Sequence, residues 1–429
     1  MTISMTTGRG NAVRLLGVSL AYFLVLLDTT VLTVALPSLG GSLAARQWVV
    51  NGYTVAFAAF LLGGGALADR FGALRVFRWG VAGFGLLSLA SAAAPNLTVL
   101  VVLRLLLGVA GAACLPSSLA LIAALYPEPA RRAKALGAWA AITGVALATG
   151  PLAGGALVAL GGWRAVFLVN VPLAAAGLAL ARGIPSLAGE RALDWPAQFA
   201  VCLFLGLLTD AIIDRRIVSA VAAAVVFAVF VIGERRSRAA TVPPGLIRVP
   251  GVAIGLASGA AINFVLSGTL FVVTLALQDG RHLTAVQTGL AFLPLTLPTA
   301  FNPLITSRIV AARGPRLLVL CGLLLLTAGA GLLAATAPAP YPVLALGLAL
   351  LGFGVSFSLP ALVTAVVSGA PGGYAGTAGG LLNAVRQMGA TVGVAVMGTG
   401  IGAGGYGPAF VTAAAVCGAA TLACAAVMR

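Results

Sequence analysis

The chain has 429 residues, of which 61% are hydrophobic and only 8% are charged, and its mean hydropathy is +1.11. Soluble domains carry about 25% charged residues, so this composition excludes a soluble globular protein. A backbone inside lipid must satisfy its own hydrogen bonds, which leaves helices or a closed barrel. The apolar runs are too long and too little alternating for barrel strands. We therefore predict an all-α integral membrane protein.

The net charge of +16 comes from 25 basic and 9 acidic residues. In a soluble protein this excess would suggest nucleic-acid binding, but in a membrane protein basic loops set the topology, so we expect no nucleic-acid partner. The single histidine and the five cysteines have no metal-ligand spacing. There is no phosphate-binding loop and no set of Ser, His and Asp for catalysis. We expect no metal, no cofactor and no enzymatic activity.

Fourteen apolar runs approach or exceed the roughly 20 residues that cross a bilayer as a helix. Their approximate limits are 15–37, 47–68, 76–94, 98–126, 134–160, 164–182, 196–213, 217–233, 251–277, 286–309, 315–336, 341–368, 375–400 and 407–428. The first run is longer than the core of a signal peptide. We predict fourteen transmembrane helices.

Two polar stretches, 182–196 and 233–251, divide these runs into six, two and six. The predicted organisation is an N-terminal six-helix half (1–182), two inserted helices with linkers (183–250) and a C-terminal six-helix half (251–429), with pseudo-symmetry between the halves. If both termini are cytoplasmic, the inside loops carry eighteen basic residues and the outside loops five. The positive-inside rule favours this orientation in the cell membrane.

The first run contains the stretch FLVLLDTTVLTVALP, and its carboxylate, Asp28, lies deep in the apolar segment. A charge at the centre of a span costs about 2.5–3.5 kcal/mol on insertion scales and usually marks a proton or substrate path. At about 100° per residue the hydroxyl-bearing residues lie on one side of the helix and Asp28 roughly opposite. We predict that Asp28 meets a neighbouring helix and carries a proton. A purely structural carboxylate is the alternative. The hydroxyl face, predicted to line a substrate cavity, consists of Tyr22, Thr29, Thr30 and Thr33.

Arg104 lies inside the fourth run and shares a helical face with Gly108 and Gly111. It should point toward a close neighbour, where it could balance a carboxylate or bond backbone carbonyls. Its contact with Asp28 stays open at this stage. The fifth run has small residues three and four apart, which let helices approach closely in lipid, together with a kink-forming proline, Pro151. We predict a hinge there, with ordinary helix packing as the alternative.

Four patterns resemble signatures of the major facilitator superfamily, and with fourteen runs they resemble its drug:proton antiporter branch, including actinobacterial antibiotic exporters. They are LDTTVLTVALPSL (27–39), GGALADRFGALR (64–75), LRLLLGVAGAA (103–113) and GVALATGPLAGGAL (144–157). Two positions depart from the usual family pattern: Leu74 replaces a basic residue, and Leu107 replaces a glutamine.

The resemblance implies proton coupling at Asp28 and Arg104. It implies a conformational switch in the loop after the second run, at Gly65, Asp69, Arg70, Gly72 and Arg75, where solvated loop charges are the alternative. It implies an antiporter hinge at Gly144, Gly150, Pro151, Gly154 and Gly155.

A polar cluster in the thirteenth run, formed by Asn383, Arg386 and Gln387, should face the cavity, as should Asn263 and Phe264 of the ninth. The mostly apolar and aromatic walls fit a small lipophilic ligand. We predict a monomeric, proton-coupled exporter of antibiotics or other toxic amphiphiles that works by alternating access. The alternatives are a proton-coupled nutrient symporter and a non-transporting receptor or scaffold.

Overall fold

The computed structural model describes residues 2–185, 195–236, 242, 244–336, 340–371, 374–402 and 406–427. Within these ranges the regular structure is helical and contains no strand. This confirms the predicted all-α class. The two polar stretches that we predicted as linkers lie partly outside the described residues, at 186–194, 237–241 and 243.

Seventeen α-helices occur in the described ranges. The first six are α1 (Thr2–Ala35), α2 (Leu43–Phe71), α3 (Ala73–Ala92), α4 (Leu97–Leu125), α5 (Pro129–Leu168) and α6 (Asn170–Leu180). They are followed by α7 (Trp195–Ile213), α8 (Ile217–Arg236) and the short α9 (Pro244–Ile247). The last eight are α10 (Pro250–Leu275), α11 (Ala285–Ala291), α12 (Leu293–Phe301), α13 (Pro303–Arg313), α14 (Arg316–Ala335), α15 (Tyr341–Gly369), α16 (Ala375–Gly402) and α17 (Gly407–Val427).

Eleven of the described helices are long and apolar enough to cross a membrane, and each coincides with a predicted run. The sixth, tenth and thirteenth runs are the three exceptions. The thirteenth run forms the continuous helix α16, but Asn383, Arg386 and Gln387 lower its hydropathy. The sixth run begins just after a backbone break at Gly161 and Gly162, where φ is −149° and +66°. Only the short α6 and the last turns of α5 remain beyond this break.

The tenth predicted run is not one continuous helix but three short ones, α11, α12 and α13. Proline lacks an N–H donor and disfavours helical backbone in the residue before it. Pro294 and Pro303 stand at the starts of α12 and α13, and Pro298 lies inside α12. The apolar composition predicted the segment, but the prolines divide it.

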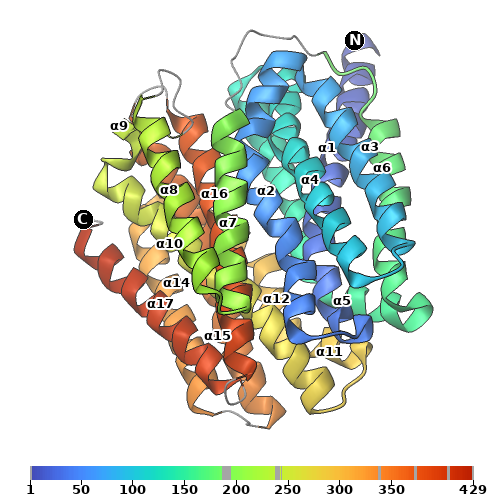
Figure 1. The fold of residues 1–429 in the computed structure, drawn as a ribbon. Coiled ribbons are helices and arrows are strands. Elements are labelled where there is room, and N and C mark those ends of the chain that lie inside the picture. The colour runs from blue at the N-terminus through green and yellow to red at the C-terminus, as the bar shows by residue number, and fades with distance from the viewer. Residues whose placement is uncertain are drawn as a thin grey trace.

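Figure 1 shows two groups of helices, with α1 to α6 on the right and most of α10 to α17 on the left, while α11 lies below α5. In the first group α1 packs against α5 and α6, and α2 against α4; in the second, α10 packs against α16 and α17, and α14 against α15. The green helices α7 and α8 lie in front of the junction, where α7 contacts both α2 and α16.

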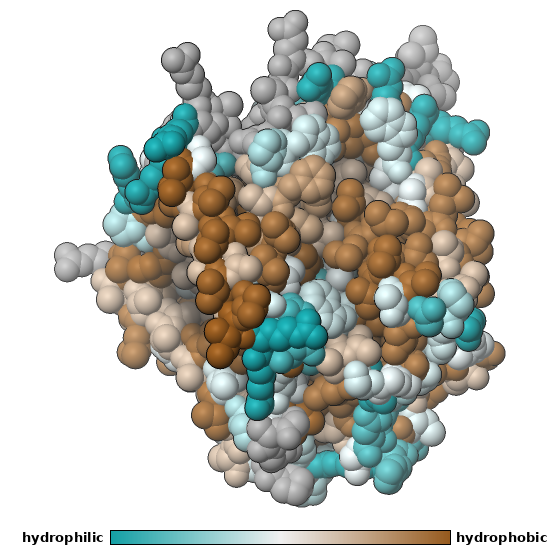
Figure 2. All heavy atoms as spheres, viewed as in Figure 1, coloured by the Kyte–Doolittle hydropathy of each residue, from teal (hydrophilic) through white to brown (hydrophobic). Residues whose placement is uncertain are grey.

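The outer surface of the bundle is apolar between its two ends. Figure 2 shows a broad hydrophobic belt with hydrophilic residues gathered above and below it on this face. Large apolar side chains point outward, among them Leu86, Phe199 and Leu422, which are 68%, 60% and 75% exposed. Such a surface suits a hydrocarbon environment rather than water.

Polar side chains begin several helices at the ends of the bundle. Ser42 accepts a hydrogen bond from the Ala45 N–H and starts α2, and Asn96 accepts one from Val99 and starts α4. Thr284 and Gln287 form a reciprocal capping box at α11. These caps satisfy backbone donors that have no partner inside the helix, so they fix where each helix begins.

The tightest packing in the first group lies between α2 and α4. A side chain at Gly108 would meet the backbone of Tyr53 and Phe57, with the Phe57 nitrogen 2.9 Å from the added carbon. Gly64 faces the backbone of Ala112 in the same way. Glycine therefore sets the distance between these helices.

We expect Gly108→Leu to destabilise the protein strongly, because the added side chain would force α2 and α4 apart. Overpacking a tight core typically costs about 1–3 kcal/mol. Gly206→Leu on α7 is the matched control, since a side chain there would meet nothing within 4 Å. Thermal unfolding of both variants in detergent tests the expectation. Equal melting temperatures for the two variants would contradict it.

Candidate functional site

A fully buried ion pair joins α1 and α4. Asp28 is 0% exposed and Arg104 is 1% exposed. The Nη1 group of Arg104 donates a hydrogen bond to Oδ2 of Asp28. The structure thus answers the question that the sequence left open, because the two charged groups predicted inside spans meet each other.

The second carboxylate oxygen also has a partner. Asn170 on α6 donates from Nδ2 to Oδ1 of Asp28 at 2.9 Å, and the same Nδ2 lies 3.2 Å from the Ser88 hydroxyl of α3. Both oxygens of Asp28 are therefore hydrogen-bonded, as a buried carboxylate requires. The amide oxygen of Asn170 is buried and has no partner among the described residues.

Residues of α2 hold the guanidinium of Arg104. Its Nε donates to the Val49 carbonyl at 3.1 Å. Its Cζ lies 4.5 Å from the centre of the Tyr53 ring, within cation–π range. The Tyr53 hydroxyl donates to the Val25 carbonyl of α1 at 3.3 Å. The cluster of Asp28, Arg104, Asn170, Ser88 and Tyr53, here called the buried polar cluster, connects five helices.

The sequence analysis did not single out Asn170, Ser88 or Tyr53. Asn170 offered a usable signal, since it is the only amide side chain in the apolar run 164–182. Ser88 and Tyr53 offered none, because single serines and tyrosines are common in membrane helices. Only the packing of α2, α3 and α6 brings them to Asp28.

The predicted hydroxyl face of α1 points in more than one direction. Tyr22 stacks on Trp139 of α5, with ring centres 4.9 Å apart. Thr29 and Thr33 donate to carbonyls one turn earlier, those of Leu26 and Thr29, at 2.6 and 3.1 Å. Thr30 donates to the Leu27 carbonyl at 3.1 Å and lies against Gly150. That these four residues line a substrate cavity stays a prediction.

A second polar group lies in the other half of the molecule. Arg386 on α16 donates from Nε to the amide oxygen of Asn263 on α10 at 3.2 Å, and from Nη1 to that of Asn383 at 3.1 Å. The bond to Asn263 joins α16 to α10 within the second group of helices.

The remaining two predicted substrate residues lie close to this group. Phe264 is 6% exposed, and its backbone lies against Gly393 of α16. The backbone carbonyl of Gln387 accepts a hydrogen bond from the Thr391 hydroxyl at 3.0 Å. Phe264 therefore belongs to the packed interface of α10 and α16, whereas the bond of Gln387 lies within α16, and the contact of both residues with a ligand stays a prediction.

The predicted hinge of α5 lies between the two groups of helices. Gly150 and Gly154 face Thr30 and Val31 of α1. A side chain at Gly155 would meet the backbone of α11, with the Val286 Cα 2.9 Å from the added carbon. Gly289 of α11 faces the backbone of Pro151 and Leu152 in return, and Gly144 approaches the Thr299 carbonyl of α12. One helix thus touches α1 with one side and the second group with another.

The predicted switch residues lie in the last turns of α2, at the junction with α3 and in the first turn of α3. Gly72 has φ +89°, a value that favours glycine, and forms the junction between the two helices. Asp69, Arg70 and Arg75 lie at this end with exposed side chains, and the Arg70 guanidinium lies 5.4 Å from the centre of the Phe71 ring. Gly65 faces Pro116 of α4 at 3.7 Å.

Several polar contacts that the sequence did not predict join the two groups. Arg46 and Asp279 form an ion pair at 2.6 Å near the starts of α2 and α11. The Gln278 amide donates to the Val34 carbonyl at 2.9 Å, and the Gln47 amide to the Val394 carbonyl at 2.9 Å. These contacts join the two groups at the end of the molecule opposite the α2–α3 loop.

We expect Arg104→Gln to destabilise the protein by about 3–5 kcal/mol, because removing one member of a buried pair leaves an uncompensated charge. The double variant Asp28→Asn, Arg104→Gln removes both charges and should recover part of this loss. Thermal unfolding of the wild type, both single variants and the double variant measures the coupling. Strictly additive losses would show that the two charges do not interact.

The comparisons with known proteins agree with this architecture. The chain matches the family model of the Major Facilitator Superfamily over residues 18–394 and 256–429. It is 34% identical to the multidrug resistance protein Stp of Mycobacterium tuberculosis, covering 91% of this chain and 76% of the relative. It is also 34% identical to the methylenomycin A resistance protein of Streptomyces coelicolor, covering 90% and 85%.

Solved structures show the same fold. A POT family transporter in complex with a thioalcohol-conjugated peptide superposes with a TM-score of 0.73 at 14% identity, covering 96% of this chain and 95% of the other. A bacterial homologue of the human lysosomal transporter Spinster, in an inward-facing and unoccupied conformation, gives a TM-score of 0.64 at 18% identity, covering 98% and 95%. The chain therefore belongs to the major facilitator superfamily and is a multi-pass membrane transporter.

Proposed function

We propose that this transporter exports small lipophilic compounds, such as antibiotics or other toxic amphiphiles, in exchange for protons. The buried ion pair of Asp28 and Arg104 carries the proposal, because a carboxylate enclosed in a membrane protein is a natural proton carrier. The printed names of relatives such as the tetracenomycin C resistance and export protein of Streptomyces glaucescens support export as the direction.

Proton uptake at Asp28 would change what holds α1 to α4. A protonated carboxyl loses its charge–charge attraction to Arg104 while keeping one oxygen to accept a hydrogen bond. The guanidinium then depends on the Val49 carbonyl and the Tyr53 ring. The weaker attraction between α1 and α4 would link the protonation state of Asp28 to helix packing in the first group.

The proposed cycle alternates access between two six-helix halves, residues 1–182 and 251–429, with α7 and α8 inserted between them. In this assignment the chain crosses the bilayer fourteen times as a monomer, with both termini and the α2–α3 loop in the cytoplasm. The contacts of α5 with α1 and α11 support a hinge at the antiporter motif. Closely packed interfaces switch between a few discrete arrangements because they cannot deform continuously. Substrate would contact Tyr22 and Arg386 between the halves.

Asp28→Asn should abolish efflux driven by a pH gradient while leaving exchange of labelled for unlabelled compound across the membrane, because exchange needs no net proton movement. The assay uses proteoliposomes with a panel of lipophilic dyes and antibiotics, beginning with ethidium. Asp210→Asn is the matched control, since this carboxylate lies at the α7–α8 junction, bonded to Ser219. It should keep gradient-driven efflux.

The same assay separates the alternatives. Gradient-driven efflux retained in Asp28→Asn would move the proton site elsewhere. Accumulation in the direction of proton flow would indicate a symporter. Absence of flux for every compound, in wild type and variants, would favour a receptor or scaffold.

Arg46→Glu should favour opening of the end closed by the Arg46–Asp279 pair. An exposed pair contributes about 0.2–1 kcal/mol, so the open population rises up to about fivefold. Labelling of Thr33→Cys by an external membrane-impermeant maleimide, in a chain lacking its five cysteines, measures this population. The charge swap Arg46→Glu, Asp279→Arg should restore the slow rate. A rise equal to that in the control Arg164→Glu would argue against a gating role for the pair.

A further inference from the structure

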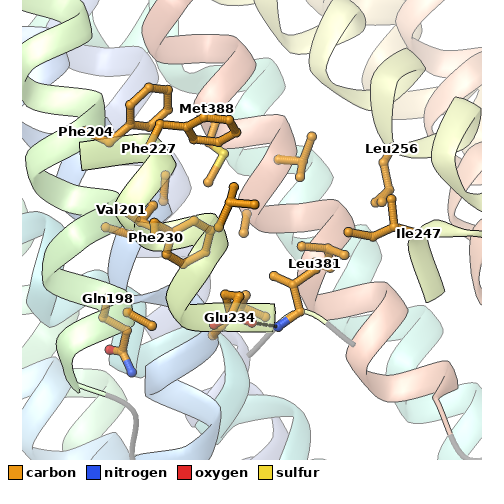
Figure 3. Close-up of a pocket in the computed structure, with 18 of the residues that line it drawn as sticks. Gln198, Val201, Phe204, Phe227, Phe230, Glu234, Ile247, Leu256, Leu381 and Met388 are labelled. Carbon is orange, nitrogen blue, oxygen red and sulfur yellow. Dashed lines mark hydrogen bonds between the residues drawn. The ribbon is translucent and has the colours of Figure 1, made fainter. Parts of the chain in front are cut away.

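A cavity of about 870 Å³ lies between the inserted helices α7 and α8 and the helices α2, α10 and α16 (Figure 3). None of the residues of the buried polar cluster and none of the Arg386 group lines it. Its wall is mainly apolar and aromatic, with Phe204, Phe227, Phe230, Leu256, Leu381 and Met388 among the lining side chains. The proposed transport cycle makes no use of this space.

The packing of α8 explains why the cavity exists. This helix packs on α7, where Phe204 and Phe227 approach with ring centres 5.0 Å apart. Only 6% of its apolar segment is buried, and Val218 is 81% exposed. An apolar space beside a lipid-facing helix loses dispersion contacts on one side when it is empty. In a bilayer, hydrocarbon chains restore those contacts.

The cavity is polar at one end. Figure 3 shows Gln198 and Glu234 at one end, and Phe204, Phe227 and Met388 at the other. Arg235 and Arg248 also line the cavity, and both side chains are exposed.

The polar end offers both positive charge and a hydrogen-bond acceptor. Glu234 accepts a hydrogen bond from the Val242 N–H at 3.0 Å, which ties the segment before α9 to α8. Gln198 is 3% exposed, and its amide oxygen has no partner among the described residues. A buried acceptor without a donor is costly. The site therefore suits a ligand with a long apolar chain, an anionic head and a hydroxyl donor.

We propose that this cavity holds an acyl chain of an anionic phospholipid, with the phosphate at Arg235 and Arg248 and a head-group hydroxyl reaching Gln198. The assignment uses the proposed orientation, in which these arginines lie at the cytoplasmic leaflet. Each basic residue near an anionic membrane surface increases the binding constant for that surface about fivefold. The lipid would fill the gap that α8 leaves and attach the inserted helices to α10 and α16.

Native mass spectrometry of the full chain with phosphatidylglycerol and phosphatidylcholine of identical acyl chains tests the site without any transport assay. We expect the wild type to prefer phosphatidylglycerol about tenfold or more, given two arginines. Arg235→Gln, Arg248→Gln should bind both lipids equally. The control Arg308→Gln, Arg313→Gln, with both residues in α13, should keep the preference. A preference that survives in the first double variant, or falls equally in the control, would overturn the proposal.

Ala253→Phe tests the apolar part of the cavity, because this half-buried residue of α10 lines it. The added ring should reduce binding of both lipids while leaving the melting temperature of the lipid-free protein unchanged. Undiminished lipid binding in Ala253→Phe would overturn the proposal. Displacement of phosphatidylglycerol by ethidium at one-to-one stoichiometry would also overturn it and assign the cavity to transported compounds. A failed efflux assay with intact lipid preference would refute only the proposed export.

Discussion

A carboxylate and a guanidinium enclosed together inside an apolar bundle form the interaction on which the first group of helices depends. Asp28 and Arg104 neutralise each other's charge, and Asn170 donates a hydrogen bond to the remaining carboxylate oxygen. Removing two charges from water is expensive, so such a pair persists only with good geometry and additional hydrogen bonds. These partners lie on five helices, α1, α2, α3, α4 and α6. The positions of the five helices are therefore mutually constrained.

Close backbone contacts constrain helix positions both within the first group and between the two groups. Gly108 lets α4 lie on α2, while Gly154 and Gly155 let α5 lie on α1 and α11 at once. Apolar side chains gain nothing from helix association in lipid, so the close packing of small residues determines which helices meet. In the hinge that we propose, a helix that packs tightly on both groups would transmit the state of α1 to the second group.

The two groups differ in how they use buried polarity. The first neutralises its arginine with a carboxylate, whereas Arg386 bonds the neutral amide oxygens of Asn263 and Asn383. We propose that its charge is available to a ligand. The cavity beside α8 adds a third environment, apolar along its length and basic at one end. Proton, exported compound and lipid would thus each have a separate place in the same chain.

Composition and periodicity were enough to predict the all-α membrane class, the regions of the eleven long apolar helices, and Asp28 and Arg104 as the charged residues of special interest. These are local properties, because twenty apolar residues and one stranded charge are visible in a single segment. The ion pair itself, the contribution of Asn170, the division of the tenth run and the cavity at α8 depended on tertiary packing. Sequence gives no distance between residues 28, 104 and 170, since only the close approach of separate helices decides which polar groups satisfy one another.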